Sequence, residues 1–143
     1  MDFYKLNLLT KYAREYGHNK IRIVGMSDTE HTICTFLFAH DGVSQDDVCD
    51  ALRLDKATVA RALLTLEEKS FVSRTQNPNN RRKNLLSITE EGKKSIADVV
   101  HIYDEWFAHI SDCLSAEEQR RFDDYCGRLL DNAREINNES GSR

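Results

Sequence analysis

The sequence has little glycine and almost no proline: its six glycines follow no repeating pattern, and Pro78 is the only proline. It lacks a glycine-rich phosphate loop, a dinucleotide-binding fingerprint and a Ser-His-Asp nucleophile elbow. Each of these motifs supplies either a reactive group or the backbone cradle that holds a cofactor phosphate. Their absence predicts a protein that is not an enzyme and that carries no cofactor.

Long apolar runs are missing too, and no segment is apolar enough to span a bilayer or to direct secretion. The cysteines are few and far apart, and no two of them form a Cys-x-x-Cys pair. Such spacing is typical of reduced thiols in the cytoplasm. We therefore expect a cytoplasmic protein that does not contact a membrane. Its four cysteines are Cys34, Cys49, Cys113 and Cys126.

The size and composition of the chain, 143 residues with 40% hydrophobic and 31% charged, predict one globular domain over residues 1–143. Its net charge of −4 is distributed unevenly. Residues 53–83 carry eight Lys or Arg against three Asp or Glu, whereas residues 98–143 carry five against eleven. A basic segment within an acidic chain indicates that this segment meets a polyanion.

The basic segment begins with a predicted helix that has two distinct faces. Asp55 is a short acceptor in the position that caps the first free N–H groups of a helix. A helix that enters the major groove of DNA needs a small, polar and basic start, because its N-terminal residues come closest to bases and phosphates. An isolated helix of this kind is more often an ordinary amphipathic helix with a solvated face, so its neighbours decide. The apolar face carries Val59, Ala62, Leu63 and Leu66, and the polar face carries Lys56, Thr58, Arg61, Thr65 and Glu68.

A second, shorter helix is predicted directly before this one. Ser44 and Asp47 have the spacing of a capping box, which predicts a helix from there through about Leu52. Only a few residues then remain before Asp55, so the chain must turn sharply between the two helices.

A β-hairpin with a basic tip is predicted after the second helix. Residues 71–76 and 85–88 have strand composition, and residues 77–80, Asn-Pro-Asn-Asn, are typical of a turn. Arg81, Arg82 and Lys83 follow the turn, and these cations repel one another unless an anion approaches them. Helix, turn, helix and basic hairpin together predict a winged helix-turn-helix, an arrangement that binds DNA.

From Leu54 to Gly92 the residues resemble the DNA-binding lobe of MarR-type transcriptional regulators. The family reads as a Leu-x-Lys-Ser/Thr-Val-Arg helix, a Leu-Glu-x-Lys-Gly exit, an Asp-Arg-Arg wing and a Leu-Thr-x-x-Gly end. This chain carries these features at 54–61, 66–72, 80–82 and 88–92. It departs from the family at Ser70, where glycine is usual, and at Asn80, where aspartate is usual.

The resemblance implies a mainly α-helical (α+β) fold. A winged helix-turn-helix lobe would occupy residues 27–92, opened by a capping box at Ser27, and residues 2–24 and 93–136 would form dimerisation helices that interlock two copies. Apolar residues recur at helical intervals in both terminal segments, which is more apolar surface than one small domain can bury. The resemblance favours one long N-terminal helix, while the β-branched residues 21–24 would also allow a short strand. Farther along, one helix is predicted from Thr89 to Ile110 and another from Ser115 to Ile136, with a frayed tail.

The sequence is compatible with two alternative functions. In the first, the protein is a sequence-specific DNA-binding transcriptional regulator, in effect a repressor that a small-molecule, metal or redox signal releases from double-stranded DNA. In the second, the winged helix is a protein-interaction module without specific DNA binding. The basic wing favours DNA, because a protein-interaction module has no need of it. The residues expected to meet DNA are Lys56, Ala57, Thr58, Arg61, Thr65, Arg81, Arg82 and Lys83.

The sensing site is less well defined by the sequence. Aromatic residues and a histidine could line an effector pocket, although aromatic residues are more often simply core. His101, Glu105 and His109 recur at four-residue intervals as weak metal candidates, but solvated histidines explain them better, and we predict no metal. Oxidant sensing by a cysteine is a further alternative. The expected pocket residues are Tyr12, Tyr16, His31, Tyr103 and Trp106.

Overall fold

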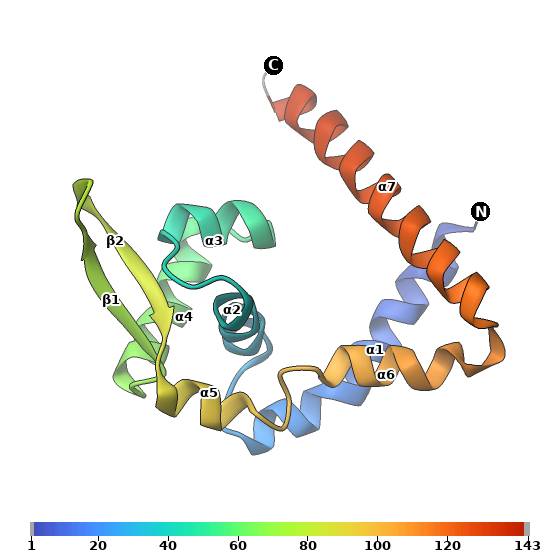
Figure 1. The fold of residues 1–143 in the computed structure, drawn as a ribbon, viewed down its shortest axis with the longest axis horizontal. Coiled ribbons are helices and arrows are strands. Elements are labelled where there is room, and N and C mark those ends of the chain that lie inside the picture. The colour runs from blue at the N-terminus through green and yellow to red at the C-terminus, as the bar shows by residue number, and fades with distance from the viewer. Residues whose placement is uncertain (1, 142–143) are drawn as a thin grey trace. The chain divides into compact units, whose positions relative to one another are not determined.

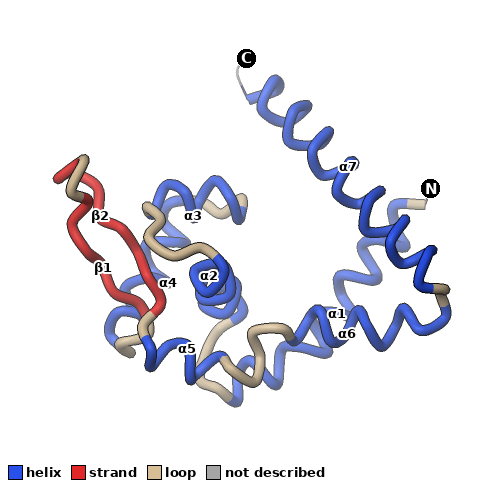
Figure 2. The backbone as a smooth tube through the Cα atoms, viewed as in Figure 1, coloured by secondary structure: helices blue, strands red, loops and turns tan. Residues whose placement is uncertain are grey.

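A computed structural model describes residues 2–141 and contains helices and one antiparallel hairpin (Figures 1 and 2). The chain divides into two compact units, one ending at Tyr103 and the other beginning at Asp104. Among the described residues, no helix is long and apolar enough to cross a membrane. In chain order the elements are α1 (Phe3–Ile23), α2 (Asp28–Ala39), α3 (Gln45–Leu52), α4 (Lys56–Glu68), β1 (Val72–Asn77), β2 (Asn80–Ile88), α5 (Glu90–Ile96), α6 (Ile102–Ile110), the 3₁₀ turn η1 (Ser111–Cys113) and α7 (Ala116–Gly141).

The first unit holds the hydrophobic core, whose buried side chains come from α1 to the start of α6. α2 lies at its centre and contacts α1, α3, α4, α5 and β2. This central position follows from the composition of α2, because its apolar residues occupy several faces rather than one stripe. The largest side chains with no exposed surface include Ile33 and Leu37 of α2, Leu63 and Leu66 of α4, and Leu86 of β2.

The predicted helix starts are confirmed by side-chain caps. Ser27 and Glu30 form a complete capping box at α2, and Ser44 and Asp47 form another at α3. At α5, Thr89 accepts a hydrogen bond from the Gly92 amide and donates one to the Ser70 carbonyl. The segment Phe3–Ile23 is one helix, so its helical spacing outweighs the strand propensity near its end.

Two tight turns require unusual backbone at residues other than glycine. Arg53, between α3 and α4, has φ 54°, and Ser70, after α4, has φ 62°. Both lie in the left-handed region that favours glycine. The chain also comes very close to itself at Gly92, where a β-carbon would collide with the carbonyl oxygen of Phe71. Glycine at position 92 is thus required by packing.

The hairpin is longer than the sequence predicted, because β2 begins at Asn80 rather than at Leu85. Its register pairs Val72 with Ile88 and Gln76 with Asn84, but then pairs Asn77 with Asn80. The irregularity leaves residues 81–83 of β2 without partners on β1. Near its base, the hairpin is fastened to the loop before α3 by two backbone hydrogen bonds between Val43 and Leu86, of 2.7 and 3.2 Å.

The single helix predicted from Thr89 to Ile110 is wrong: α5 ends at Ile96 and α6 begins at Ile102, with turns between them (Figure 2). Bonds between residues three apart interrupt the α-helical pattern here, from the Val99 amide to the Ile96 carbonyl and from the Ile102 amide to the Val99 carbonyl. The Val99 carbonyl also accepts a hydrogen bond of 2.6 Å from Nε2 of His31. This contact holds the break against α2.

The second unit consists of most of α6, η1 and α7. Phe107 and Phe122 stack with ring centroids 5.7 Å apart, which joins α6 to α7. None of the side chains in α7 is buried. The tail predicted to fray after Ile136 remains helical to Gly141, because extending an existing helix carries no nucleation cost; residues 142 and 143 lie outside the described part of the chain.

Candidate nucleic-acid interface

The N-terminus of α4 is firmly capped and leaves its first side chains exposed. Asp55 accepts hydrogen bonds from the Thr58 hydroxyl at 2.7 Å and from the Thr58 amide at 2.8 Å. These two bonds lower the pKa of the Asp55 carboxyl, with the hydroxyl contributing most. Lys56 and Ala57 are both exposed beside this cap. The helix therefore begins with a fixed backbone and a free cation.

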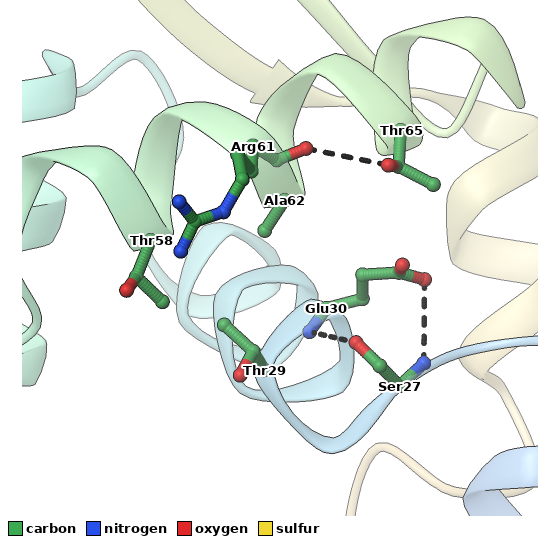
Figure 3. A pocket seen from close by; sticks show the side chains of 7 residues that line it. All are labelled: Ser27, Thr29, Glu30, Thr58, Arg61, Ala62 and Thr65. Atoms are coloured by element: carbon green, nitrogen blue, oxygen red, sulfur yellow. Dashed lines mark hydrogen bonds between the residues drawn. The ribbon is translucent and has the colours of Figure 1, made fainter.

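The polar face of α4 borders a pocket of about 240 Å³ that it shares with the start of α2 (Figure 3). Thr58, Arg61 and Thr65 line it from α4, while Ser27 and Thr29 line it from the α2 side. The Thr65 hydroxyl donates to the backbone carbonyl of Arg61 at 3.3 Å, which ties Thr65 to its own helix. Arg61 lines this pocket and is itself an exposed residue (Figure 3).

Three cations of the basic segment pair with other side chains of the protein. Lys69 bonds the buried carboxylate of Glu30 at 2.9 Å and the Gly25 carbonyl at 2.6 Å. Arg74 bonds Glu67 at 2.7 Å and the side chain of Gln45 at 3.3 Å. The third, Lys83, lies 3.5 Å from Asp46 of α3 in an exposed pair. Exposed pairs of this kind contribute about 0–1 kcal/mol, so phosphate can displace Asp46 from Lys83.

Other cations of the same segment keep their charge available. Within residues 2–141, the side chains of Lys56, Arg61, Arg81 and Arg82 form neither an ion pair nor a hydrogen bond, and all four are exposed. Two of them lie on α4 and two on the wing. β1 contacts α4, so the helix and the hairpin pack against each other within the first unit (Figure 1).

The wing carries its cations on a bulge. Arg81, Arg82 and Lys83 are the residues without partners in the register of the hairpin. A bulge of this kind redirects side chains away from the regular alternation of a strand. Asn80, where the family usually has aspartate, contacts the main chain of Arg82: its side-chain oxygen accepts from the Arg82 amide at 3.1 Å. The Arg82 guanidinium is left free to turn outward.

Of the expected pocket residues, the structure brings His31 and Tyr103 into contact. Their rings meet edge to face with centroids 5.9 Å apart, and Tyr103 also packs tightly against Gly17. Tyr16 packs on the edge of the core, whereas Tyr12 is 53% exposed. Trp106 is half-buried and belongs to the second unit.

His31 is buried. Burial lowers the pKa of its imidazole, while the hydrogen bond to Val99 and the charge of Asp28 act in the opposite direction. The weak metal candidates are placed differently. His101, Glu105 and His109 are all exposed, and within residues 2–141 no group of three or more His, Cys, Asp or Glu could hold a metal ion.

The cysteines divide into two pairs by burial. Cys34 and Cys49 are buried, and Cys113 and Cys126 are exposed. Burial, followed by the charge of Glu30, raises the pKa of the Cys34 thiol to about 12. Burial also raises the pKa of Cys49. Because the thiolate is the reactive form, these two buried thiols are poor targets for oxidants.

One exposed residue of α4 escaped the sequence-based assignment. Leu64 has 59% of its surface exposed, although the neighbouring Leu63 is fully buried. The signal was present as two consecutive leucines, since adjacent helix positions point about 100° apart and both cannot face the centre of the core.

Comparison with known proteins identifies the same lobe. Residues 26–83 match the model of the MarR family. The uncharacterized HTH-type transcriptional regulator YdgJ of Bacillus subtilis is 30% identical over 112 residues, which are 78% of this chain and 68% of YdgJ. The transcriptional regulator HosA of Escherichia coli O111:H- is 32% identical over 57% of this chain and 60% of its own length. The crystal structure of a MarR transcriptional regulator from Methanosarcina mazei Go1 superposes with a TM-score of 0.83 at 26% identity, covering 93% of this chain and 96% of that one.

Proposed function

This chain belongs to the MarR family, and from that membership we propose that it is a sequence-specific, DNA-binding transcriptional regulator. The family consists of transcription factors rather than enzymes. The observation that carries the proposal is the set of exposed cations without internal partners on α4 and the wing, in a chain whose net charge is −4. Cations that a protein does not neutralise internally are available to phosphate, which dominates affinity for DNA.

The proposed regulator is a homodimer that binds a pseudo-palindromic operator. Residues 2–24 and 93–136 would supply the dimer contacts, and residues 27–92 the reading lobe. Large apolar side chains support this assignment, because they are exposed along both segments and a second copy could cover them. Two copies related by a twofold axis would present two reading helices to two half-sites. The exposed side chains include Phe3, Tyr4 and Leu9 of α1 and Tyr125, Leu129, Leu130 and Ile136 of α7.

The regulator would act as a repressor that a signal releases from its operator. Burial and the raised pKa values of Cys34 and Cys49 make the exposed Cys113 and Cys126 the better targets for an oxidant. Three treatments separate the classes of signal: zinc, peroxide, and a panel of small organic acids. Zinc acting as the signal would raise the thermal stability of the protein, since a ligand of the folded state stabilises it by mass action. Peroxide acting as the signal would release DNA from the wild type and not from a variant lacking all four cysteines.

The test of DNA recognition begins by selecting an operator from a pool of random duplexes with the wild-type protein. We expect an enriched sequence with two related half-sites, centred about 10 base pairs or a multiple of that apart. Titrations by fluorescence anisotropy at several salt concentrations then compare this operator with random DNA. If no sequence is enriched and the two duplexes bind equally, the proposal is wrong and a protein-interaction role for the winged helix takes its place.

Two variants of α4 separate base contacts from phosphate contacts. Arg61→Ala should cost about 1–3 kcal/mol on the operator and relax the preference at one position, because a guanidinium can bond the edge of a guanine. Lys56→Ala should weaken operator and random DNA alike and reduce the salt slope by about one unit, because Lys56 lies at the helix start where phosphate approaches. Equal behaviour of the two variants would contradict this division of roles.

A further inference from the structure

The outward face of α4 is centred on residues that carry no polar side-chain atom. Helical periodicity places Ala57 and Leu64, seven residues apart, almost directly opposite the buried side chains of Val59 and Leu66. Ala57 is exposed, Leu64 has 59% of its surface exposed, and Ala60 is half-buried beside them. An apolar strip, formed by Ala57, Ala60 and Leu64, therefore runs along the side of the helix that points away from the core.

Cations border this apolar strip. Lys56 precedes it at the helix start, and Arg61 lies beside it one turn later. Within residues 2–141, neither side chain forms an ion pair or a hydrogen bond. A surface with methyl groups at its centre and free cations at its edges fits a ligand that is anionic outside and apolar inside. The major groove of DNA has this arrangement, because phosphates line its edges and the thymine C5-methyl group is the apolar feature of its floor.

We propose that Leu64, assisted by Ala57, reads thymine methyl groups in the operator. This inference rests on the proposed function, and it adds a base contact that involves no hydrogen bond. The sizes of the two side chains agree with the docking of a helix by its N-terminus. Ala57 lies in the first turn, where the helix comes closest to the bases, and its short side chain avoids a clash. Leu64 lies about 10 Å farther along the axis, where a longer side chain is needed to reach the groove floor.

The contact predicts which operator positions depend on the methyl group. Ala57 and Leu64 are separated by a distance that corresponds to about three base-pair steps. Each half-site should then contain one strongly methyl-dependent thymine read by Leu64, and a weaker one about three base pairs away read by Ala57. Arg61, between them on the helix, would contact the edge of an intervening guanine.

Replacement of thymine by uracil tests the proposal, since it removes the C5-methyl group and leaves base pairing unchanged. The operator selected by the wild-type protein is synthesised with uracil at one thymine position at a time and titrated by fluorescence anisotropy. We expect wild-type affinity to fall about fourfold at the position read by Leu64, the value of one buried methyl group. Leu64→Ala should bind the thymine operator about fourfold more weakly and show no further loss with uracil.

Ile23→Ala is the matched control, because Ile23 is an exposed aliphatic residue, at 83%, that lies outside α4. This variant should retain the full uracil effect of the wild type. If the wild type distinguishes operator from random DNA but binds thymine and uracil operators equally, the methyl contact is wrong while the proposed function stands. If Leu64→Ala keeps the uracil effect, another residue reads the methyl group. Failure to distinguish operator from random DNA would overturn both proposals together.

Discussion

Ser70 holds a left-handed backbone conformation that a glycine would adopt without steric cost. Its φ is 62°, and its amide and carbonyl are both used, the first by the Glu67 carbonyl and the second by the Thr89 hydroxyl. The turn is thus fixed by backbone hydrogen bonds and by the close approach at Gly92, and not by the identity of the side chain. The sequence identified position 70 as unusual but left open whether the turn changes, because backbone geometry is not encoded in residue type alone.

Replacement of Ser70 by glycine should stabilise the protein. The left-handed conformation costs a non-glycine residue about 1–2 kcal/mol, and glycine removes this cost. Glycine in turn lowers stability by about 0.4–1 kcal/mol, because it increases the conformational entropy of the unfolded chain. We expect Ser70→Gly to raise the free energy of unfolding by about 0.5–1 kcal/mol in urea titration. Ser73→Gly, in an exposed position of β1, should have the opposite effect. A loss of stability in both variants would mean that the turn carries no strain.

His31 should make stability depend on pH near neutrality. Burial lowers the pKa of its imidazole below the ordinary value of 6.5, so the unfolded state binds the proton more readily than the folded state. The contribution of neutral His31 to the free energy of unfolding is therefore fully present above pH 6.5. It declines as pH falls below 6.5, by up to about 1.4 kcal/mol per pH unit. In urea titrations between pH 7.5 and 5, His31→Gln should show a shallower decline in stability than the wild type, because glutamine does not titrate. Its amide can still donate to the Val99 carbonyl and so keep the contact. Parallel declines would assign the pH dependence to other groups.

At the scale of elements, the sequence predicts those features that depend on residues close to one another in the chain. Capping residues and turn composition lie within a few positions of the helices and strands they define, so the helix starts and the hairpin were anticipated. The break between α5 and α6 was not, because it is held by a bond between His31 and Val99, 68 residues apart. The pairing of Lys83 with Asp46 was missed for the same reason. The polar residues of α4 were identified from periodicity, whereas Leu64 was assigned neither to the apolar face nor to the polar face.

The wing offers a prediction about its own geometry. Asn80→Asp would keep the acceptor that holds the Arg82 amide and add a negative charge with which the Arg82 guanidinium can pair. We expect operator binding to tighten by up to about fivefold in anisotropy titrations, because an oriented guanidinium loses less freedom on binding and an exposed ion pair contributes about 0–1 kcal/mol. Asn84→Asp places the same charge on an exposed position of β2 and should weaken binding. Equal weakening in both variants would show that charge near phosphate outweighs orientation.

At the scale of the whole molecule, assembly should govern stability. Leu129 is 60% exposed on a helix without any buried side chain. Leu129→Asp should therefore weaken the proposed homodimer and lower the melting temperature, with the loss greatest at low protein concentration. Sedimentation velocity at micromolar concentration measures the dissociation directly. Gly127→Asp adds the same charge to α7 at a position with open space around it and should leave the dimer intact. A wild-type protein that sediments as a 16.5 kDa monomer would contradict the assignment.

The bulge on the wing also makes the protein vulnerable in one place. Residues 81–83 are consecutive arginine and lysine residues on an exposed hairpin tip, without partners on β1. Trypsin cleaves after these residue types and prefers exposed segments that can open locally. Trypsin and the operator would then compete for the same stretch of backbone. In a mixture of the two, the fraction of protein that stays uncleaved would report how much of it is bound to DNA. Proteolysis at this hairpin would separate the reading helix from half of its wing and end recognition irreversibly.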